Sequence, residues 1–217
     1  WQGLPPPPPV TFYDGFEHTD VGSRPSRAYS RVEGKGDNIE VTEETAATGK
    51  RSLKITDAPG LEHGFNPHFS YAPNHREGIT TFSFDVRMEQ GAELSLEWRQ
   101  QPGKPHYYIG PKLLFRNGQL TFADQPPLPL PLGVWTHIEI SAGFGSKTDG
   151  TWQLTVTTPG AEPKHFSGLK FVNPETRSVT WLGFISVANC KGVYYIDNVK
   201  LETDFVEEAR ALGADVK

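Results

Sequence analysis

The sequence has a single cysteine, Cys190, among its 217 residues. One cysteine cannot form a disulfide within the chain, so stability has to come from a buried core, which a chain of this length can build. Cys190 lies close to Val187 and Ala188, and we predict that it is a small core residue, as an unpaired thiol often is. An intrachain disulfide framework is therefore excluded.

Long apolar runs and an excess of basic residues are also missing. No stretch approaches the ~20 consecutive apolar residues of a membrane-spanning helix, so we expect no membrane span. The chain has 21 Lys and Arg against 26 Asp and Glu, which gives a formal net charge of −5. A nucleic-acid-binding domain carries a basic patch or stripe, so we expect no nucleic-acid partner.

Turn residues and aromatics are abundant instead, with 22 glycines, 19 prolines and 12% aromatic residues. Apolar side chains occupy every second position from Phe82 to Met88, and again from Leu94 to Trp98. This period of two predicts half-buried strands at 78–88 and 94–99. The dipeptide Asn117-Gly118 is a hairpin turn signal between two further strands.

Strands are also predicted along the rest of the chain. They lie at 10–16, 37–42, 51–56, 107–115, 119–122, 134–142, 152–158, 164–171, 179–187 and 192–201. The last two are apolar on both faces and should lie centrally in a sheet. So many short strands in succession predict an all-β fold, a two-sheet antiparallel β-sandwich of the jelly-roll type.

The two ends of the chain differ from this pattern. Residues 1–9 hold five consecutive prolines, which favour an extended polyproline II segment and predict a linker from an upstream domain. Residues 10–202 form the predicted sandwich domain. Residues 203–217 are predicted to form a short C-terminal helix, with Thr203 as its N-cap and Gly213 at its end.

Four segments carry a resemblance to a known group of domains. They are residues 13–17 (YDGFE), 49–55 (GKRSLKI), 133–140 (GVWTHIEI) and 194–201 (YYIDNVKL). In order and spacing, they resemble the jelly rolls of carbohydrate-binding modules and laminin G-like domains, which belong to the concanavalin A-like group. The resemblance covers most of residues 10–202.

This resemblance implies a carbohydrate-binding accessory module, non-catalytic, in a larger secreted or cell-surface protein. The expected partners are a polysaccharide or oligosaccharide and a neighbouring domain of the same polypeptide. The group also includes glycosidases, lyases and domains without a known ligand, so it indicates the fold more strongly than the function.

The resemblance also implies a structural calcium ion. In many such modules a glutamate of the first strand and an aspartate of the last strand share Ca²⁺, and the matching residues are Glu17 and Asp197, aided by carbonyls near Lys50. Calcium takes six to eight oxygen ligands, which carboxylates and carbonyls can supply. The alternative is that both carboxylates are ordinary turn or cap residues.

The candidate ligand-binding residues are the polar side chains that alternate with core positions on the middle strands. In the strand at 107–115, Tyr107 and Ile109 have the parity of the core. The outward set is Glu97, Arg99, His106, Tyr108, Lys112, His137 and Glu139. On one sheet face they would form a groove of mixed charge, in which arginine and lysine suit an acidic sugar. The alternative is a solvated face of paired charges.

Two other functions use the same fold. A polysaccharide lyase or glycoside hydrolase would place Arg99 against a uronate and use Tyr108 and His137 to move protons, as alginate-lyase-like jelly rolls do. The local motifs of those enzymes do not appear around these residues. A structural or adhesion module would instead pack an apolar surface on a neighbouring domain.

Tryptophans and histidines complete the candidates. Trp98 and Trp152 have the parity of the core, whereas Trp135 and Trp181 are more open and could serve as sugar platforms. The segment 63–75 contains three histidines whose spacing matches no tight metal-ligand pattern, so we predict a packed loop there.

Overall fold

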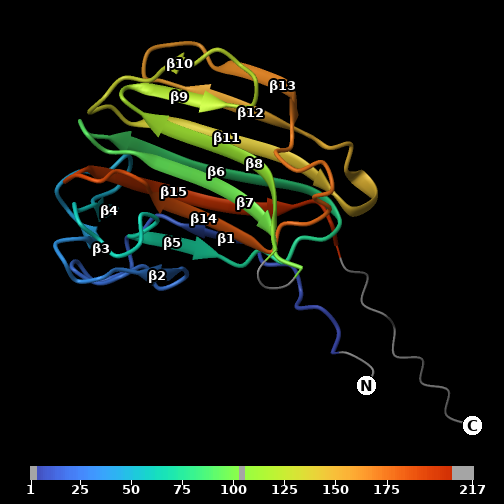
Figure 1. The fold of residues 1–217 in the computed structure, drawn as a ribbon, viewed down its shortest axis with the longest axis horizontal. Coiled ribbons are helices and arrows are strands. Elements are labelled where there is room, and N and C mark those ends of the chain that lie inside the picture. The colour runs from blue at the N-terminus through green and yellow to red at the C-terminus, as the bar shows by residue number, and fades with distance from the viewer. Residues whose placement is uncertain (1–3, 103–105, 207–217) are drawn as a thin grey trace, which may run out of the picture.

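The computed structural model describes residues 4–102 and 106–206. They form two antiparallel sheets that pack face to face as a sandwich (Figure 1). The eight-stranded sheet has the order β13 (Lys164–Lys170), β12 (Thr151–Thr157), β11 (Thr136–Phe144), β6 (Gly78–Met88), β15 (Val193–Thr203), β4 (Ser52–Thr56) and β3 (Asn38–Thr42), and β1 (Phe12–Asp14) also pairs with β15.

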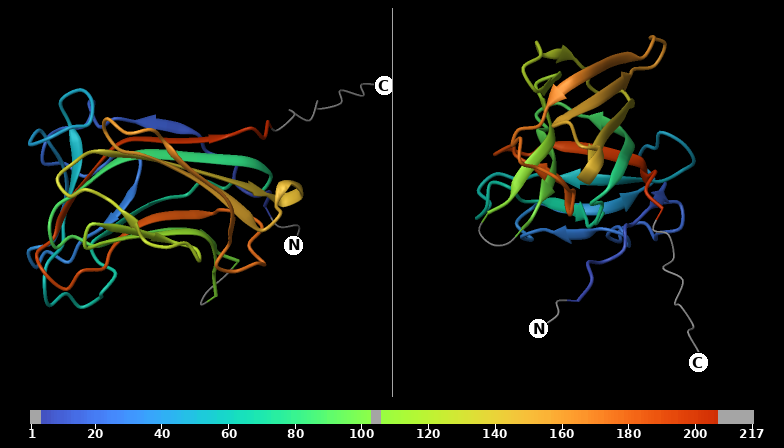
Figure 2. Two further views of the ribbon diagram at one scale, coloured as in Figure 1. Left: turned by 90° about the horizontal axis from the view of Figure 1, so that it is seen from above. Right: turned by 90° about the vertical axis from the view of Figure 1, so that its right-hand side faces the viewer.

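The second layer is a seven-stranded sheet. Its order is β10 (Leu128–Pro129), β9 (Gln119–Phe122), β8 (Tyr108–Arg116), β7 (Leu94–Gln100), β14 (Trp181–Ser186), β5 (His68–Tyr71) and β2 (Tyr29–Arg31). Both layers are visible in Figure 2. The two-sheet sandwich is the fold that the strand pattern predicted.

The core fills the space between the two sheets. The rings of Phe69 and Phe184 stack at a centroid distance of 4.6 Å, and Phe84 meets Phe184 edge-on at 5.0 Å. The predicted inward residues of β6 and β7 are all buried, including Trp98. Trp152 is buried as well. Alternation therefore predicted the inner faces of these strands correctly, because successive side chains of a strand point to opposite faces.

The positions of the last strands also match the prediction. β14 lies between β7 and β5, and β15 lies between β6 and β4. Phe12 pairs with Leu201, so the first strand lies beside the last one. Among the described residues, no helix is long and apolar enough to cross a membrane.

Three local predictions are wrong or extend beyond the described residues. Cys190 is exposed rather than buried, because it lies in the turn between β14 and β15, where its Sγ donates to the carbonyl of Gly91 at 3.3 Å. The segment 63–75 is not wholly a loop, since it contributes β5. Thr203 ends β15 instead of capping a helix, and residues 207–217 of the predicted helix lie outside the described part of the chain.

Candidate functional site

The outer face of the seven-stranded sheet contains a hollow of about 360 Å³, here called the Arg99 hollow. It is lined by Phe65, His68, Arg99, Gln101, Tyr107, Trp181 and Ile185. Strand register explains how they meet, because Trp181 pairs with Arg99 and His68 pairs with Ile185. Three adjacent strands therefore supply most of this surface.

Arg99 is held between aromatic rings. Its Cζ lies 4.2 Å from the ring centroid of Tyr107 and 4.3 Å from that of Trp181. Gly183 makes room for this arrangement, because a Cβ at that position would overlap the Trp181 indole. The indole therefore lies over the glycine, and guanidinium–aromatic contacts of this kind are attractive.

A buried carboxylate fixes the other side of Arg99. Glu97 is 6% exposed, and its Oε2 makes both contacts with Arg99. This oxygen accepts a hydrogen bond from Nε at 2.8 Å and lies 2.6 Å from Nη2. The second oxygen, Oε1, lies 3.2 Å from Nζ of Lys112 and accepts the Ser95 hydroxyl at 3.3 Å. Two cations on one carboxylate leave a positive excess, and among the described residues Nη1 of Arg99 has no hydrogen-bond partner.

His68 belongs to a chain of hydrogen bonds that starts at Glu33. Asn66 is buried and donates its Nδ2 to Glu33 at 2.8 Å, and its Oδ1 lies 3.0 Å from Nδ1 of His68. The Asn66 amide, followed by the backbone N–H of Glu62, lowers the pKa of Glu33 to about 2. An ionised carboxylate only accepts hydrogen bonds, so the amide of Asn66 is fixed in one orientation.

This orientation determines the tautomer of His68. Oδ1 of Asn66 can only accept, so Nδ1 of His68 carries the proton and Nε2 carries the lone pair. Burial lowers the pKa of His68. A hydrogen bond to the backbone of Phe65 opposes this effect, and the charges of Arg31 and Arg99 add to it, so the pKa stays below its usual value. The imidazole is therefore neutral near pH 7 and offers an acceptor nitrogen on a side chain that lines the Arg99 hollow.

The structure brings together only part of the predicted ligand-binding set. Glu97, Arg99 and Lys112 share the outer face, as alternation predicted. His106 is exposed and precedes β8. The ring that contacts Arg99 belongs to Tyr107, not Tyr108.

A β-bulge explains this exchange of tyrosines. Glu97 pairs with Lys112 and Arg99 pairs with Ile109, so β8 advances three residues where β7 advances two. One extra residue in a strand moves every following side chain to the opposite face of the sheet. Tyr108 therefore shares the side of Gln100, with which it pairs. Uninterrupted alternation gave the wrong face for both Tyr107 and Tyr108.

His137 and Glu139 lie on β11 in the other sheet, so they cannot belong to the Arg99 hollow. Nδ1 of His137 lies 2.7 Å from Asp85 Oδ1, and Oδ2 of Asp85 accepts Nδ2 of Asn198 at 2.6 Å. The hydrogen bond to Asp85 raises the pKa of His137. Sequence alternation identified the outward side of β11 but could not show which sheet the strand joins.

The two predicted calcium ligands meet at one loop. Oε1 of Glu17 accepts the backbone N–H groups of Lys50 and Arg51, each at 2.8 Å. Oδ2 of Asp197 accepts the N–H of Ala47 at 2.9 Å, and burial raises the pKa of Asp197 to about 6. Within the described residues no group of three or more His, Cys, Asp and Glu is placed to hold a metal. Calcium binding here stays a prediction.

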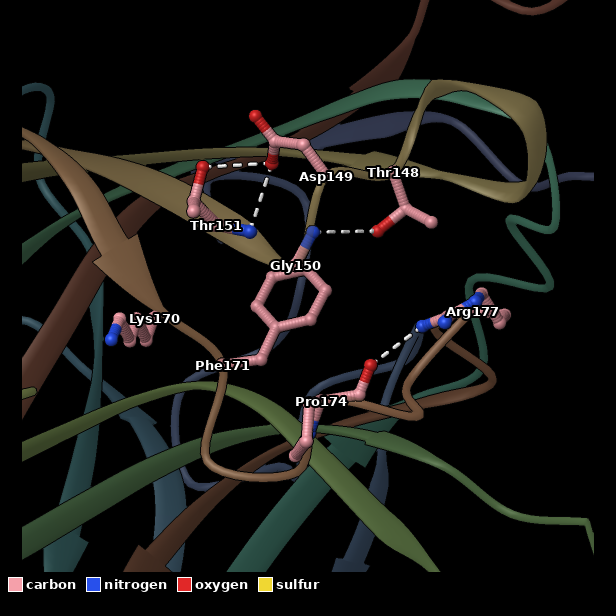
Figure 3. Close-up of a pocket in the computed structure, with 8 residues that line it drawn as sticks. All are labelled: Thr148, Asp149, Gly150, Thr151, Lys170, Phe171, Pro174 and Arg177. Carbon is pink, nitrogen blue, oxygen red and sulfur yellow. Dashed lines mark hydrogen bonds between the residues drawn. The ribbon is translucent and has the colours of Figure 1, made fainter.

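Two further hollows share Lys170 as a lining residue. The Lys112 hollow, of about 230 Å³, is lined by Lys112, Leu114, Thr121, Phe122, Ala123, Trp152, Lys170 and Val172. The Arg177 hollow, of about 670 Å³, is lined by Thr148, Asp149, Gly150, Thr151, Lys170, Phe171, Pro174 and Arg177 (Figure 3). Lys112, which lines the first of them, also pairs with Glu97, and Lys170 lines both.

Comparison with known proteins identifies the fold. No protein-family profile matches the chain, and no curated protein matches it significantly. An endo-β-1,4-glucuronan lyase from the fungus Trichoderma reesei is similar in structure, with a TM-score of 0.63 and 15% identity over 89% of this chain and 95% of that one. A cellulose induced protein, Cip1, has a TM-score of 0.60 and 14% identity over 91% and 99% of the two chains.

Two other solved structures extend this comparison. An alginate lyase, Aly36B, has a TM-score of 0.56 and 10% identity over 92% of this chain and 99% of that one. A peanut lectin has a TM-score of 0.51 and 10% identity over 93% and 100%. The chain therefore has the concanavalin A-like jelly-roll fold that its sequence resembled.

Proposed function

We propose that the chain binds an acidic polysaccharide through the Arg99 hollow, as a carbohydrate-binding module of a secreted or cell-surface protein. One observation carries the proposal. Arg99 is fixed by Glu97 and by two aromatic rings, and its Nη1 remains without a partner among the described residues. A sugar carboxylate can accept a hydrogen bond from Nη1, and a sugar ring can pack on the exposed side chain of Tyr107.

The charges around the hollow favour an anion. Arg99 and Lys112 flank the single carboxylate of Glu97, and Arg31 lies on the same face because it pairs with His68. On the strands of this face these three cations are accompanied by one carboxylate, that of Glu97, on a chain whose formal net charge is −5. Local charge of opposite sign to the whole molecule attracts an acidic ligand to this face.

The structural neighbours support the same class of ligand. A glucuronan lyase and an alginate lyase, by their names, act on polymers of uronic acids. Their low identity carries over the fold alone, so the proposal for this chain depends on its own residues. The placement of Arg99 against aromatic rings provides that support.

Calorimetric titration with uronic-acid oligomers and with neutral cello-oligomers tests the proposal. The Arg99→Ala variant should weaken binding about tenfold or more, since hydrogen bonds to charged groups contribute ~1.5–3 kcal/mol. Arg116→Ala is the matched control, because Arg116, the last residue of β8, forms a similar ion pair with Glu93 and does not line the hollow. Equal binding of neutral and acidic oligomers, or full binding by Arg99→Ala, would refute the proposal.

A second function, polysaccharide lysis by β-elimination, is favoured by the neutral His68. Arg99 would pair with the uronate carboxylate, and Nε2 of His68 would take the proton from C5. The C4–O bond then breaks as a C4=C5 double bond forms, and the leaving oxygen takes the proton of the Tyr107 hydroxyl. General acid–base transfer of this kind needs side chains within hydrogen-bond reach of the substrate. Tyr107 and His68 here replace the Tyr108 and His137 of the sequence prediction.

Ultraviolet absorbance of the unsaturated product distinguishes lysis from binding. A lyase should release it from a polyuronate, and His68→Gln should abolish release while oligomer binding persists. If wild-type protein binds the polymer without forming product, the lyase function is rejected and the non-catalytic module remains.

A further inference from the structure

Two lysines link the three hollows. Lys112 contacts Glu97 beside the Arg99 hollow and also lines the Lys112 hollow. Lys170 lines both the Lys112 hollow and the Arg177 hollow. A ligand that leaves Arg99 along β8 therefore meets Lys112 and then Lys170.

Backbone hydrogen bonds hold this surface together. Val172 donates its N–H to the carbonyl of Gly110 at 3.2 Å, and Asn173 donates to that of Ile109 at 2.8 Å. The N–H of Ile109 in turn donates to Oδ1 of Asn173 at 2.7 Å. The segment after Phe171 is thus fastened to β8, the strand next to Arg99. The Arg177 hollow is held in a fixed place relative to the Arg99 hollow.

The Arg177 hollow itself presents cations to a ligand. Nη1 of Arg177 donates to the carbonyls of Pro174 at 2.6 Å and Thr176 at 3.0 Å, which fixes the side chain. Within the described residues neither Nε and Nη2 of Arg177 nor Nζ of Lys170 has a hydrogen-bond or ion-pair partner. Figure 3 shows the ring of Phe171 between these two side chains.

Asp149 is the one acidic residue among those that line the three hollows, and Glu97 borders them through Lys112. Glu97 is bound by Arg99 and Lys112. Asp149 accepts the N–H of Thr151 at 2.9 Å and its hydroxyl at 2.7 Å, and these bonds lower the pKa of Asp149. Its carboxylate therefore stays ionised with Oδ1 directed at Thr151, and the Arg177 hollow holds two cations, Lys170 and Arg177, against this one carboxylate.

We infer that Lys170 and Arg177 form a remote subsite for the same acidic polymer that occupies the Arg99 hollow. The inference depends on the proposed function, and it specifies the ligand further as a long polyanionic chain that crosses all three hollows. Affinity then rises with chain length, because only long chains reach Lys170 and Arg177 while they contact Arg99.

Calorimetric titration with oligouronates, from the disaccharide to long chains, tests this inference. For long chains, Lys170→Ala combined with Arg177→Ala should weaken binding roughly fivefold, since each exposed ionic contact changes affinity by about two- to threefold. Binding of the shortest oligomers that still bind should not change. Lys170→Ala alone should give part of the loss, and within the described residues the Lys170 side chain makes no hydrogen bond or ion pair that the substitution would break.

Lys164→Ala is the matched control, because Lys164 is exposed on the same strand, β13, and lines none of the three hollows. Unchanged long-chain binding by Lys170→Ala and the double variant, or affinity independent of chain length, would overturn the inference while Arg99-dependent binding persists. Failure of every oligomer to bind would overturn the proposed function as well.

Discussion

Replacing Gly183 with alanine would test whether the Arg99 hollow depends on the position of one indole. Gly183 pairs with Glu97 on one side and Ser70 on the other, in the middle of β14. A Cβ there would overlap the Trp181 ring, so the ring has to leave its place beside Arg99. The backbone of Gly183 is not left-handed, so alanine fits the strand itself.

The expected loss of affinity follows from the contacts of the indole. A cation–aromatic contact contributes ~0.5–2 kcal/mol, and Arg99 would lose one of the two rings that hold it. We expect Gly183→Ala to weaken binding of an acidic oligosaccharide by about 1–2 kcal/mol, or roughly 5–30-fold. Folding stability should change little, because replacing a strand glycine with alanine gains ~0.5–1 kcal/mol and offsets the disturbed packing.

Calorimetric titration, tryptophan fluorescence and urea unfolding would be measured on the same samples. Trp181→Ala and the double variant Gly183→Ala/Trp181→Ala complete a mutant cycle. If Gly183→Ala acts through the indole, the double variant should bind no more weakly than Trp181→Ala. Additive losses, or wild-type affinity of Gly183→Ala, would refute this reasoning.

The other predictions concern the core, one buried acid and calcium. Phe184→Ala should lower the free energy of unfolding by about 3–5 kcal/mol in urea titrations, because the Phe184 ring fills the space between the sheets. A loss below about 1 kcal/mol, as for a tolerated core substitution, would contradict that packing. Burial raises the pKa of Asp57 to about 6. The folded chain therefore binds this proton more tightly than the unfolded chain, and stability falls as pH rises from about 4 to 6. Asp57→Asn should be more stable than wild type by about 2 kcal/mol at pH values above ~7 and should lose this advantage below pH ~4. Equal stability of the two proteins in both pH ranges would contradict a buried ionised carboxylate at position 57. A calcium ion shared by Glu17 and Asp197 predicts a lower Tm in EDTA than in CaCl2, a difference that Glu17→Gln should reduce, and identical Tm values would reject the ion.

The fold was predictable because both sheets bury one face along regular strands. From Phe82 to Met88 every second side chain is buried, and this periodicity is directly visible in the sequence. Alternation within a strand does not show which strands lie beside it. β11 and β8 have similar alternation, yet β11 joins the eight-stranded sheet and β8 joins the seven-stranded one. His137 and Arg99 therefore lie on different sheets.

The candidate site was less predictable because it depends on irregular features. The bulge in β8 is one extra residue near Gly110-Pro111, and it moved Tyr107 to the face of Arg99. His68 lies on a strand of only four residues, too short for a clear period. Its alternation with Phe69 was a usable signal, since Phe69 is buried and His68 faces the hollow.

The most direct test of the account is an NMR titration that follows the indole N–H of Trp181 and the Nε–H of Arg99. The ligand is an oligoglucuronate, and the control is the same oligomer with its carboxyl groups reduced to alcohols. The account predicts saturable shifts of both signals with the acidic oligomer and much weaker shifts with the reduced one. Equal responses to the two oligomers, or no response at either residue, would contradict the central claim that the Arg99 hollow recognises an acidic sugar.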